Sequence, residues 1–98
     1  MNQNTLFVFA TIYPKKECYT QAEKSLLGII DNTKKEKGCI EFRVHQNLKQ
    51  SKLFLYEEWS DENALLSHHK ELYTLDVLKK FESWLDKPTD IVKMKKLK

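Results

Sequence analysis

The chain contains very little glycine, which excludes the loops that most nucleotide-binding proteins use to hold phosphates. Gly28 and Gly38 are the only two glycines in 98 residues. Dinucleotide fingerprints and P-loops each need several glycines within a few positions, because the backbone must approach the phosphates closely. We therefore expect no nucleotide cofactor.

Cysteine and arginine are also scarce. Cys18 and Cys39 are far apart and match no metal-ligand spacing, so we interpret both as buried thiols and expect no metal. Arg43 is the only arginine, although the net charge is +3. Base readout and bidentate phosphate binding rely heavily on arginine. We therefore expect no nucleic-acid partner.

Long apolar runs are missing. No segment approaches the roughly 20 apolar residues that span a bilayer, and residues 1–5 lack the pattern of a secretory signal. We expect a cytoplasmic protein without membrane contact. The C-terminal lysines alternate with Val92, Met94 and Leu97, which is typical of a solvated strand edge. The 41% of residues that are hydrophobic suffice for the core of one domain over residues 1–98.

The first half of the chain predicts a strand, a helix and a second strand. Residues 5–13 are rich in β-branched and aromatic side chains, which favour a strand. Apolar residues recur at helical spacing over residues 17–37, and Gly38 supplies a stop, so we predict one amphipathic helix there. Residues 40–45 alternate between apolar and polar side chains, which indicates the second strand.

The second half predicts a strand, an interrupted helix and a final strand. Residues 53–59 are strongly strand-like and complete a hairpin. Ser60 is a good N-cap for a short helix. After a break near residues 71–73, Leu75, Leu78 and Phe81 keep helical spacing until Pro88. The last strand is predicted over residues 89–97.

This order predicts an α+β, ferredoxin-like βαββαβ fold, with a four-stranded antiparallel sheet and helices on one face. The other face of the sheet is also apolar in sequence. The first strand directs Val8 and Ala10 to one side and Phe7 and Phe9 to the other, and Phe54 and Tyr56 continue the second set. An apolar patch of this size usually marks an interface, so we predict a homodimer that pairs these faces.

Few residues are candidates for chemistry. Glu57 precedes Trp59 by two positions, so in a strand both point to the same apolar face. His68 shares a helical face with Ala64 and Leu65 and points inward, whereas His69 lies further round the helix, toward solvent. Each residue also has a structural explanation: the glutamate as a solvated strand end, the histidine as a hydrogen-bonded helix end.

The whole set of motifs resembles the antibiotic biosynthesis monooxygenase superfamily, also described as the YgiN-like quinol monooxygenase family. The resemblance covers nearly the full chain. It rests on a Gly-Cys pair followed by an aromatic, on Glu-x-Trp at the end of the third strand, and on a helix that ends in histidine: Gly38, Cys39, Phe42, Glu57, Trp59, Asp61, Glu62, Ala64, Leu65 and His68.

The chain departs from the family pattern at one position. Many members carry a second histidine five residues after the first, where this chain has Tyr73. The haem-degrading branch of the family carries a tryptophan at the position of His68 and a histidine near Leu78, so haem oxygenation is disfavoured here.

The resemblance implies a dimeric α+β barrel and oxygenation of a quinol-like or small aromatic substrate by molecular oxygen, without metal or flavin. It implies His68 as the catalytic base, with Glu57 or Tyr73 as its orienting partner. Phe42, Trp59 and Leu65 are then the expected substrate-binding residues.

Two alternatives remain at this point. The chain could be a non-catalytic dimeric protein that binds small lipophilic molecules. It could also be an isomerase of a small phosphorylated carbonyl compound, because a relative of the family handles such a molecule. The isomerase hypothesis predicts a basic cavity mouth, and a strictly apolar cavity would exclude it.

Overall fold

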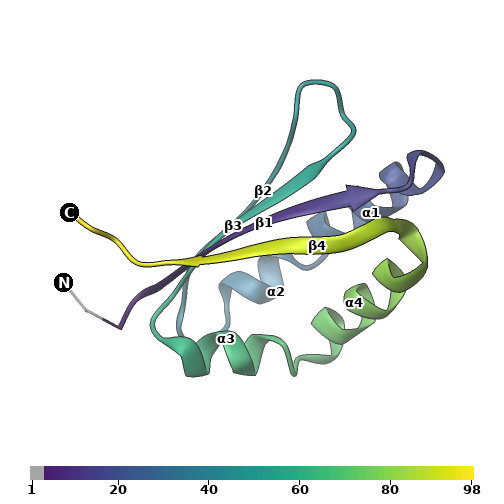
Figure 1. Cartoon of the computed structure of the whole chain (residues 1–98). Helices are drawn as coiled ribbons and strands as arrows, with labels where there is room; N and C mark the ends of the chain where they lie inside the picture. Colours follow the sequence, from purple (N-terminus) through teal and green to yellow (C-terminus); the bar gives the residue numbers. More distant parts are fainter. Residues whose placement is uncertain (1–3) are drawn as a thin grey trace.

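Four antiparallel strands form one sheet in the order β2-β3-β1-β4, and the helices lie against one of its faces (Figure 1). The computed structural model describes residues 4–98. The predicted ferredoxin-like order is confirmed. Its elements are β1 (Leu6–Pro14), the 3-10 turn η1 (Lys16–Cys18), α1 (Tyr19–Leu27), α2 (Ile30–Lys34), β2 (Cys39–Gln46), β3 (Leu53–Trp59), α3 (Glu62–His68), α4 (Leu72–Trp84) and β4 (Leu85–Met94).

The register of the sheet brings one residue from each strand into a row beneath the helices. Val8 on the central strand β1 pairs with Glu57 on β3 and with Lys93 on β4, and Glu57 pairs with Phe42 on β2. Residues that pair directly across strands share a face of the sheet. This row therefore places a carboxylate and an ammonium group on the otherwise apolar face that the helices cover.

The hydrophobic core lies between this face and the helices. Helix α1 contributes Ala22 and Leu26, and α4 contributes Val77 and Phe81. Trp59, on β3, is the largest of the fully buried side chains, at 0% exposure. Within residues 4–98, no helix has the length and apolarity that crossing a bilayer requires.

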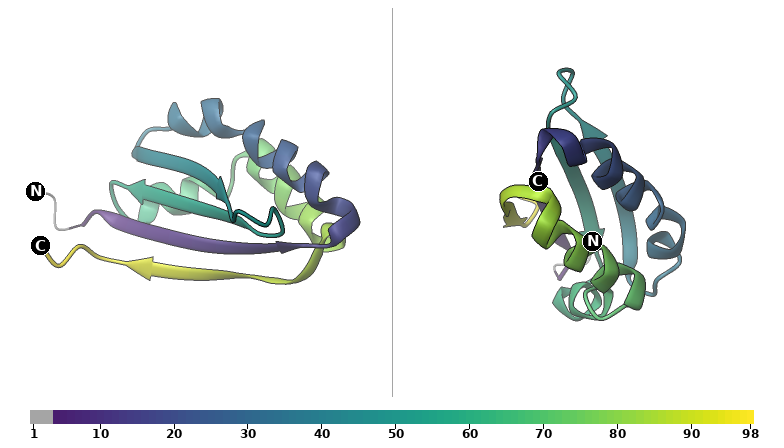
Figure 2. Two further views of the ribbon diagram at one scale, coloured as in Figure 1. Left: turned by 90° about the horizontal axis from the view of Figure 1, so that it is seen from above. Right: turned by 90° about the vertical axis from the view of Figure 1, so that its right-hand side faces the viewer.

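Among residues 4–98, no helix lies over the opposite face of the sheet, as the two views in Figure 2 show. We call this the outer face. Phe9 stacks on Phe54 there, with ring centroids 5.8 Å apart. The predicted alternation along β1 and β3 is confirmed. Six apolar or aromatic residues share this face: Phe7, Phe9, Phe54, Tyr56, Val92 and Met94.

The helix predicted over residues 17–37 is interrupted, so that prediction is wrong in its continuity. The amide of Gly28 still donates a helical hydrogen bond to the carbonyl of Lys24, four residues back. The amide of Ile29 instead donates to the carbonyl of Leu26, only three residues back. This tighter turn ends α1, at a glycine with low helix propensity. Helix α2 then restarts on a shifted axis at Ile30.

The cap of α3 is one residue later than predicted. Asp61, rather than Ser60, is the N-cap, and its Oδ1 accepts a hydrogen bond from the amide of Ala64 at 2.8 Å. The amide of Ser60 instead donates to the carbonyl of Gly38 at 2.8 Å. That bond holds Ser60 to the start of β2, so the helix begins after it.

Four smaller predictions also need correction. Strand β4 begins at Leu85, and Pro88 lies within it, because β4 is an edge strand where a missing amide is tolerated. The alternation over residues 40–45 would bury Ile40 together with Phe42, but Ile40 is 53% exposed, since a bulge interrupts the pairing between Cys39 and Glu41.

The helical spacing of Leu75, Leu78 and Phe81 would place all three on the buried face of α4. Leu75 and Leu78 instead lie at its surface, and the buried residues of α4 are Thr74, Val77 and Phe81. The two cysteines are free and only half-buried.

Candidate active site

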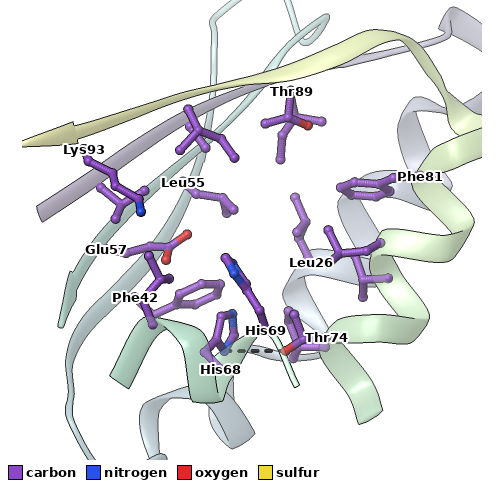
Figure 3. Close-up of a pocket in the computed structure, with 18 residues that line it drawn as sticks. Leu26, Phe42, Leu55, Glu57, His68, His69, Thr74, Phe81, Thr89 and Lys93 are labelled. Atoms are coloured by element: carbon purple, nitrogen blue, oxygen red, sulfur yellow. Dashed lines mark hydrogen bonds between the residues drawn. The ribbon is translucent and has the colours of Figure 1, made fainter. Parts of the chain in front are cut away.

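An apolar pocket of about 160 Å³ lies between the sheet and the helices (Figure 3). Its deep wall comes from β1, α1 and α4, and its exposed lining residues, His69, Leu78, Ile91 and Lys93, mark a mouth between β4 and the helices. The full lining is Val8, Ala10, Ile12, Leu26, Ile29, Phe42, Leu55, Glu57, Leu65, His68, His69, Thr74, Val77, Leu78, Phe81, Thr89, Ile91 and Lys93.

Glu57 supplies a buried carboxyl group to this pocket, as its position in the strand predicts. The residue is 5% exposed, and its Oε1 accepts a hydrogen bond from Trp59 Nε1 at 2.8 Å. Burial raises the pKa of Glu57, while the indole hydrogen bond and the nearby His68 oppose that rise. A carboxyl group in such a place holds a proton to higher pH than a solvated one and can exchange it with a bound molecule.

His68 ends α3 and is also buried, at 4% exposure. Its ring packs against Trp59 at 4.8 Å and against Phe42 at 5.7 Å between centroids. Its Nδ1 lies 2.9 Å from Glu36 Oε2 and 3.5 Å from Thr74 Oγ1. Figure 3 shows the second ring nitrogen directed toward the pocket. The predicted inward orientation of His68 is confirmed.

Tyr73 lies near His68 but outside the pocket lining. Its hydroxyl donates a hydrogen bond to Glu36 Oε2, the oxygen that also contacts His68. Burial raises the pKa of Tyr73, and the hydrogen bond and charge of Glu36 raise it further. The phenol is therefore neutral at physiological pH and reaches His68 only through Glu36.

The predicted substrate-binding residues also divide into those that line the pocket and one that does not. Phe42 and Leu65 line the pocket, whereas Trp59 lies behind its wall. Trp59 contacts Glu57 through its indole nitrogen and His68 through its ring. It therefore supports two pocket residues instead of touching a molecule in the pocket.

Two residues in this region were missed or placed differently by the sequence analysis. Glu36 lies in the turn before β2, within a lysine-rich stretch that carries no periodic signal. His69 is exposed as predicted, but its ring also borders the pocket (Figure 3). Burial lowers the pKa of His69, and the charges of His68 and Lys93 lower it further.

Other kinds of site find less support among residues 4–98. No group of three histidine, cysteine or acidic side chains converges there as metal ligands do. Burial raises the pKa of Cys39 to about 11, with smaller contributions from nearby glutamates, so its thiol is protonated at neutral pH. A protonated thiol is a poor nucleophile.

Solved structures share this fold over nearly the whole chain. Rv0793 from Mycobacterium tuberculosis aligns with a TM-score of 0.91 and 20% identity, over 96% of each chain. A conserved protein from Methanosarcina mazei has a TM-score of 0.88 and 29% identity, over 97% of this chain and 95% of its own. A proposed antibiotic biosynthesis monooxygenase from Nitrosomonas europaea has a TM-score of 0.90 and 14% identity, over 99% of this chain and 94% of its own.

Sequence comparison gives a family as well as a fold. No sequence among curated proteins matches this chain. Residues 5–80 do match the sequence profile of the antibiotic biosynthesis monooxygenases. That segment begins before β1 and includes β2, β3, α3 and most of α4, and therefore Glu57 and His68. The chain thus belongs to the antibiotic biosynthesis monooxygenase family.

Proposed function

We propose that this protein is a monooxygenase that oxidises a single-ring, quinol-like substrate with molecular oxygen, without metal or organic cofactor. The observation that carries the proposal is the presence of two buried acid–base groups, Glu57 and His68, on an otherwise apolar pocket. Family membership supports monooxygenation as the reaction class.

The size of the pocket supports a substrate with one ring. An engineered apolar cavity of about 150 Å³ binds benzene, and the pocket here measures about 160 Å³. Its walls are mostly aliphatic and aromatic side chains, which stabilise a flat apolar ring by removing it from water. A polycyclic quinol would need the walls to move apart.

The proposed chemistry starts with removal of a proton from the substrate. His68 takes a proton from a substrate hydroxyl, and the resulting electron-rich anion transfers an electron to oxygen. The semiquinone and superoxide then form a carbon–oxygen bond, and loss of water gives a hydroxyquinone. One hydroquinone and one oxygen molecule thus become one hydroxyquinone and one water. The protein orients the ring and excludes bulk water, while Glu57 exchanges protons with the reacting oxygens.

We propose in addition that the functional unit is a homodimer paired through the outer face. Phe9, Val92 and Met94 are 38%, 52% and 37% exposed there. Complete burial of a side chain of this size is worth roughly 1.5 to 3 kcal/mol, so covering the exposed part of each of these adds about half of that or less, before the entropic cost of association. Sedimentation of the purified chain at micromolar concentration tests this, and a monomer would contradict it.

Oxygen uptake by the metal-free protein tests the enzymatic proposal. We expect consumption with single-ring hydroquinones, and the hydroxyquinone as product. His68→Ala should lower kcat/KM by roughly 10²- to 10⁴-fold, the contribution of a general base. Ser67→Ala, at an exposed neighbour on α3, is the matched control.

Two results would change this conclusion. Tight binding of hydroquinones without oxygen uptake would favour the non-catalytic binder. The isomerase alternative requires cationic groups for a phosphate, and the one lysine of the pocket lining, Lys93, is paired with Glu62 at 2.7 Å. Turnover of a phosphorylated carbonyl compound and none of a quinol would nevertheless establish it.

A further inference from the structure

Glu36 connects two residues that the family resemblance had placed together in the active site. Its Oε2 lies 2.9 Å from His68 Nδ1 and also accepts the hydroxyl hydrogen of Tyr73. The side chains of His68 and Glu36 are only 5% and 9% exposed. Glu36 is not part of the pocket lining, so it contacts the Nδ1 edge of the histidine ring from outside the pocket.

The geometry restricts the protonation of His68. An ionised carboxylate only accepts hydrogen bonds, and the hydroxyl of Tyr73 already donates one to the same oxygen. The contact at Nδ1 therefore requires a hydrogen on that nitrogen. In the neutral ring this leaves Nε2 as the unprotonated nitrogen. Figure 3 shows Nε2 directed toward the pocket.

We propose that Glu36 is a positioning residue that holds neutral His68 in the Nδ1–H tautomer, so that the lone pair of Nε2 faces the substrate. Tyr73 keeps the carboxylate in place by donating to it from α4. In the Nε2–H tautomer, a hydrogen would point at the substrate and His68 could not accept its proton. The catalytic consequence rests on the proposed function, whereas the tautomer does not.

Several groups surround the ring and complete this arrangement. Glu57 and Trp59 approach from β3, and the rings of Trp59 and Phe42 pack against the imidazole in tilted arrangements. His69 follows on the same helix, with its ring centroid 5.6 Å away. Thr74 Oγ1 lies 3.5 Å from Nδ1, beyond the usual length of such a bond. Glu36 is therefore the acceptor that decides the tautomer.

Nitrogen-15 NMR of the histidine rings tests the tautomer in the full-length wild-type chain. Signals of His45, His68 and His69 are assigned with His45→Gln and His69→Gln variants. Spectra are recorded across a pH titration, and the tautomer is read on the alkaline side of the His68 transition. We expect hydrogen on Nδ1 and none on Nε2. Hydrogen on Nε2 of His68 would overturn the proposal, and this measurement needs no variant at position 36.

Variants at position 36 provide the second test. We expect Glu36→Ala to lose the preference for Nδ1–H and to lower kcat by roughly 10²-fold or more with a smaller change in KM. Glu36→Gln, whose amide oxygen can still accept from Nδ1, should recover part of both. Glu82→Gln on the exposed side of α4 is the control. A folded Glu36→Ala variant with unchanged tautomer and kcat would contradict the proposal.

The two measurements separate this inference from the proposed function. The Nδ1–H tautomer without oxygen uptake for any hydroquinone leaves the role of Glu36 intact and removes the monooxygenase. Hydroquinone turnover with the Nε2–H tautomer leaves the enzyme intact and removes the role of Glu36.

Discussion

The two faces of the sheet are similar in sequence but differ in what they do. Both carry large apolar side chains at alternate positions of β1 and β3. The covered face also carries Glu57, buried to 5% exposure, whereas Glu58 on the outer face bonds to Tyr56 at 2.8 Å in a partly buried position. The covered face thus holds both the core and the candidate chemistry. The outer face, in the part of the chain that the structure describes, holds apolar area without a buried acid–base group.

The largest expected difference between the faces is in their contribution to stability. Trp59→Ala on the covered face should lower the free energy of unfolding by roughly 3 to 5 kcal/mol, because it leaves a cavity and removes a partner of Glu57. Phe54→Ala on the outer face is the matched variant and should cost the monomer much less. Urea denaturation of both variants in a Phe9→Asp background, which keeps the chain monomeric, measures the two losses. Equal losses would mean that the two faces are packed alike.

The next effect concerns association. Phe9→Asp places a charge at the centre of the outer face, beside Phe54. We expect the dissociation constant of the dimer to rise at least about 30-fold, the effect of losing a central contact worth roughly 2 kcal/mol. Analytical ultracentrifugation over a concentration series gives the value. Glu17→Asp, at an exposed position on η1, is a control that should leave it unchanged.

A smaller effect is expected in the pH dependence of folding stability, and it should come from Glu57 and not from Glu58 on the outer face. Burial raises its folded-state pKa above the ordinary value of 4.5, so the folded chain binds more protons than the unfolded chain once the pH passes that value. Its contribution to stability therefore falls as the pH rises. Glu57→Gln removes this loss, and we expect the variant to gain stability relative to the wild type as the pH rises above the ordinary glutamate pKa of 4.5. Thermal denaturation at several pH values, with Glu58→Gln as the control, checks the trend.

The smallest effect is expected at the mouth of the pocket. Lys93 and Glu62 form an ion pair of 2.7 Å in which each side chain is 51% exposed. Such pairs contribute about 0 to 1 kcal/mol, so Lys93→Met should change stability by less than about 1 kcal/mol. Calorimetric titration with hydroquinone should give an unchanged or higher affinity. A large loss of affinity would show that the mouth selects an anionic ligand.

The arrangement of the sheet could be predicted because alternation is a property of the strand backbone. Successive side chains of a strand point to opposite faces, so Phe9 and Ala10 had to separate once β1 was recognised. The same periodicity placed Glu57 beside Trp59. The single turn that separates Ala64 from His68 placed the histidine inward. Local pattern therefore gave the orientation of these two groups, whereas their proposed catalytic roles came from the family resemblance.

The remaining features depend on contacts between distant parts of the chain. Ser60 and Asp61 are both good N-caps, and the choice between them follows from the bond of Ser60 to Gly38. Glu36 precedes its partner His68 by 32 positions and lies in a turn, so no periodicity connects them. The resemblance implied Glu57 or Tyr73 as the orienting partner of His68, and in the structure Glu36 Oε2 lies between Tyr73 and His68.

Gly38 lies in the turn that carries Glu36 and packs against α3, the helix that carries His68. Its backbone has a φ of 94°, and a Cβ added there would lie 2.6 Å from the Cβ of Ala64 and 2.8 Å from Ser60 Oγ. The side chain of Ala64 on α3 thus packs directly against the backbone of Gly38. This close contact sets the distance between the turn and the helix. A larger residue at position 38 or 64 would therefore force the turn and the helix apart, and the spacing between Glu36 and His68 depends on both positions staying small.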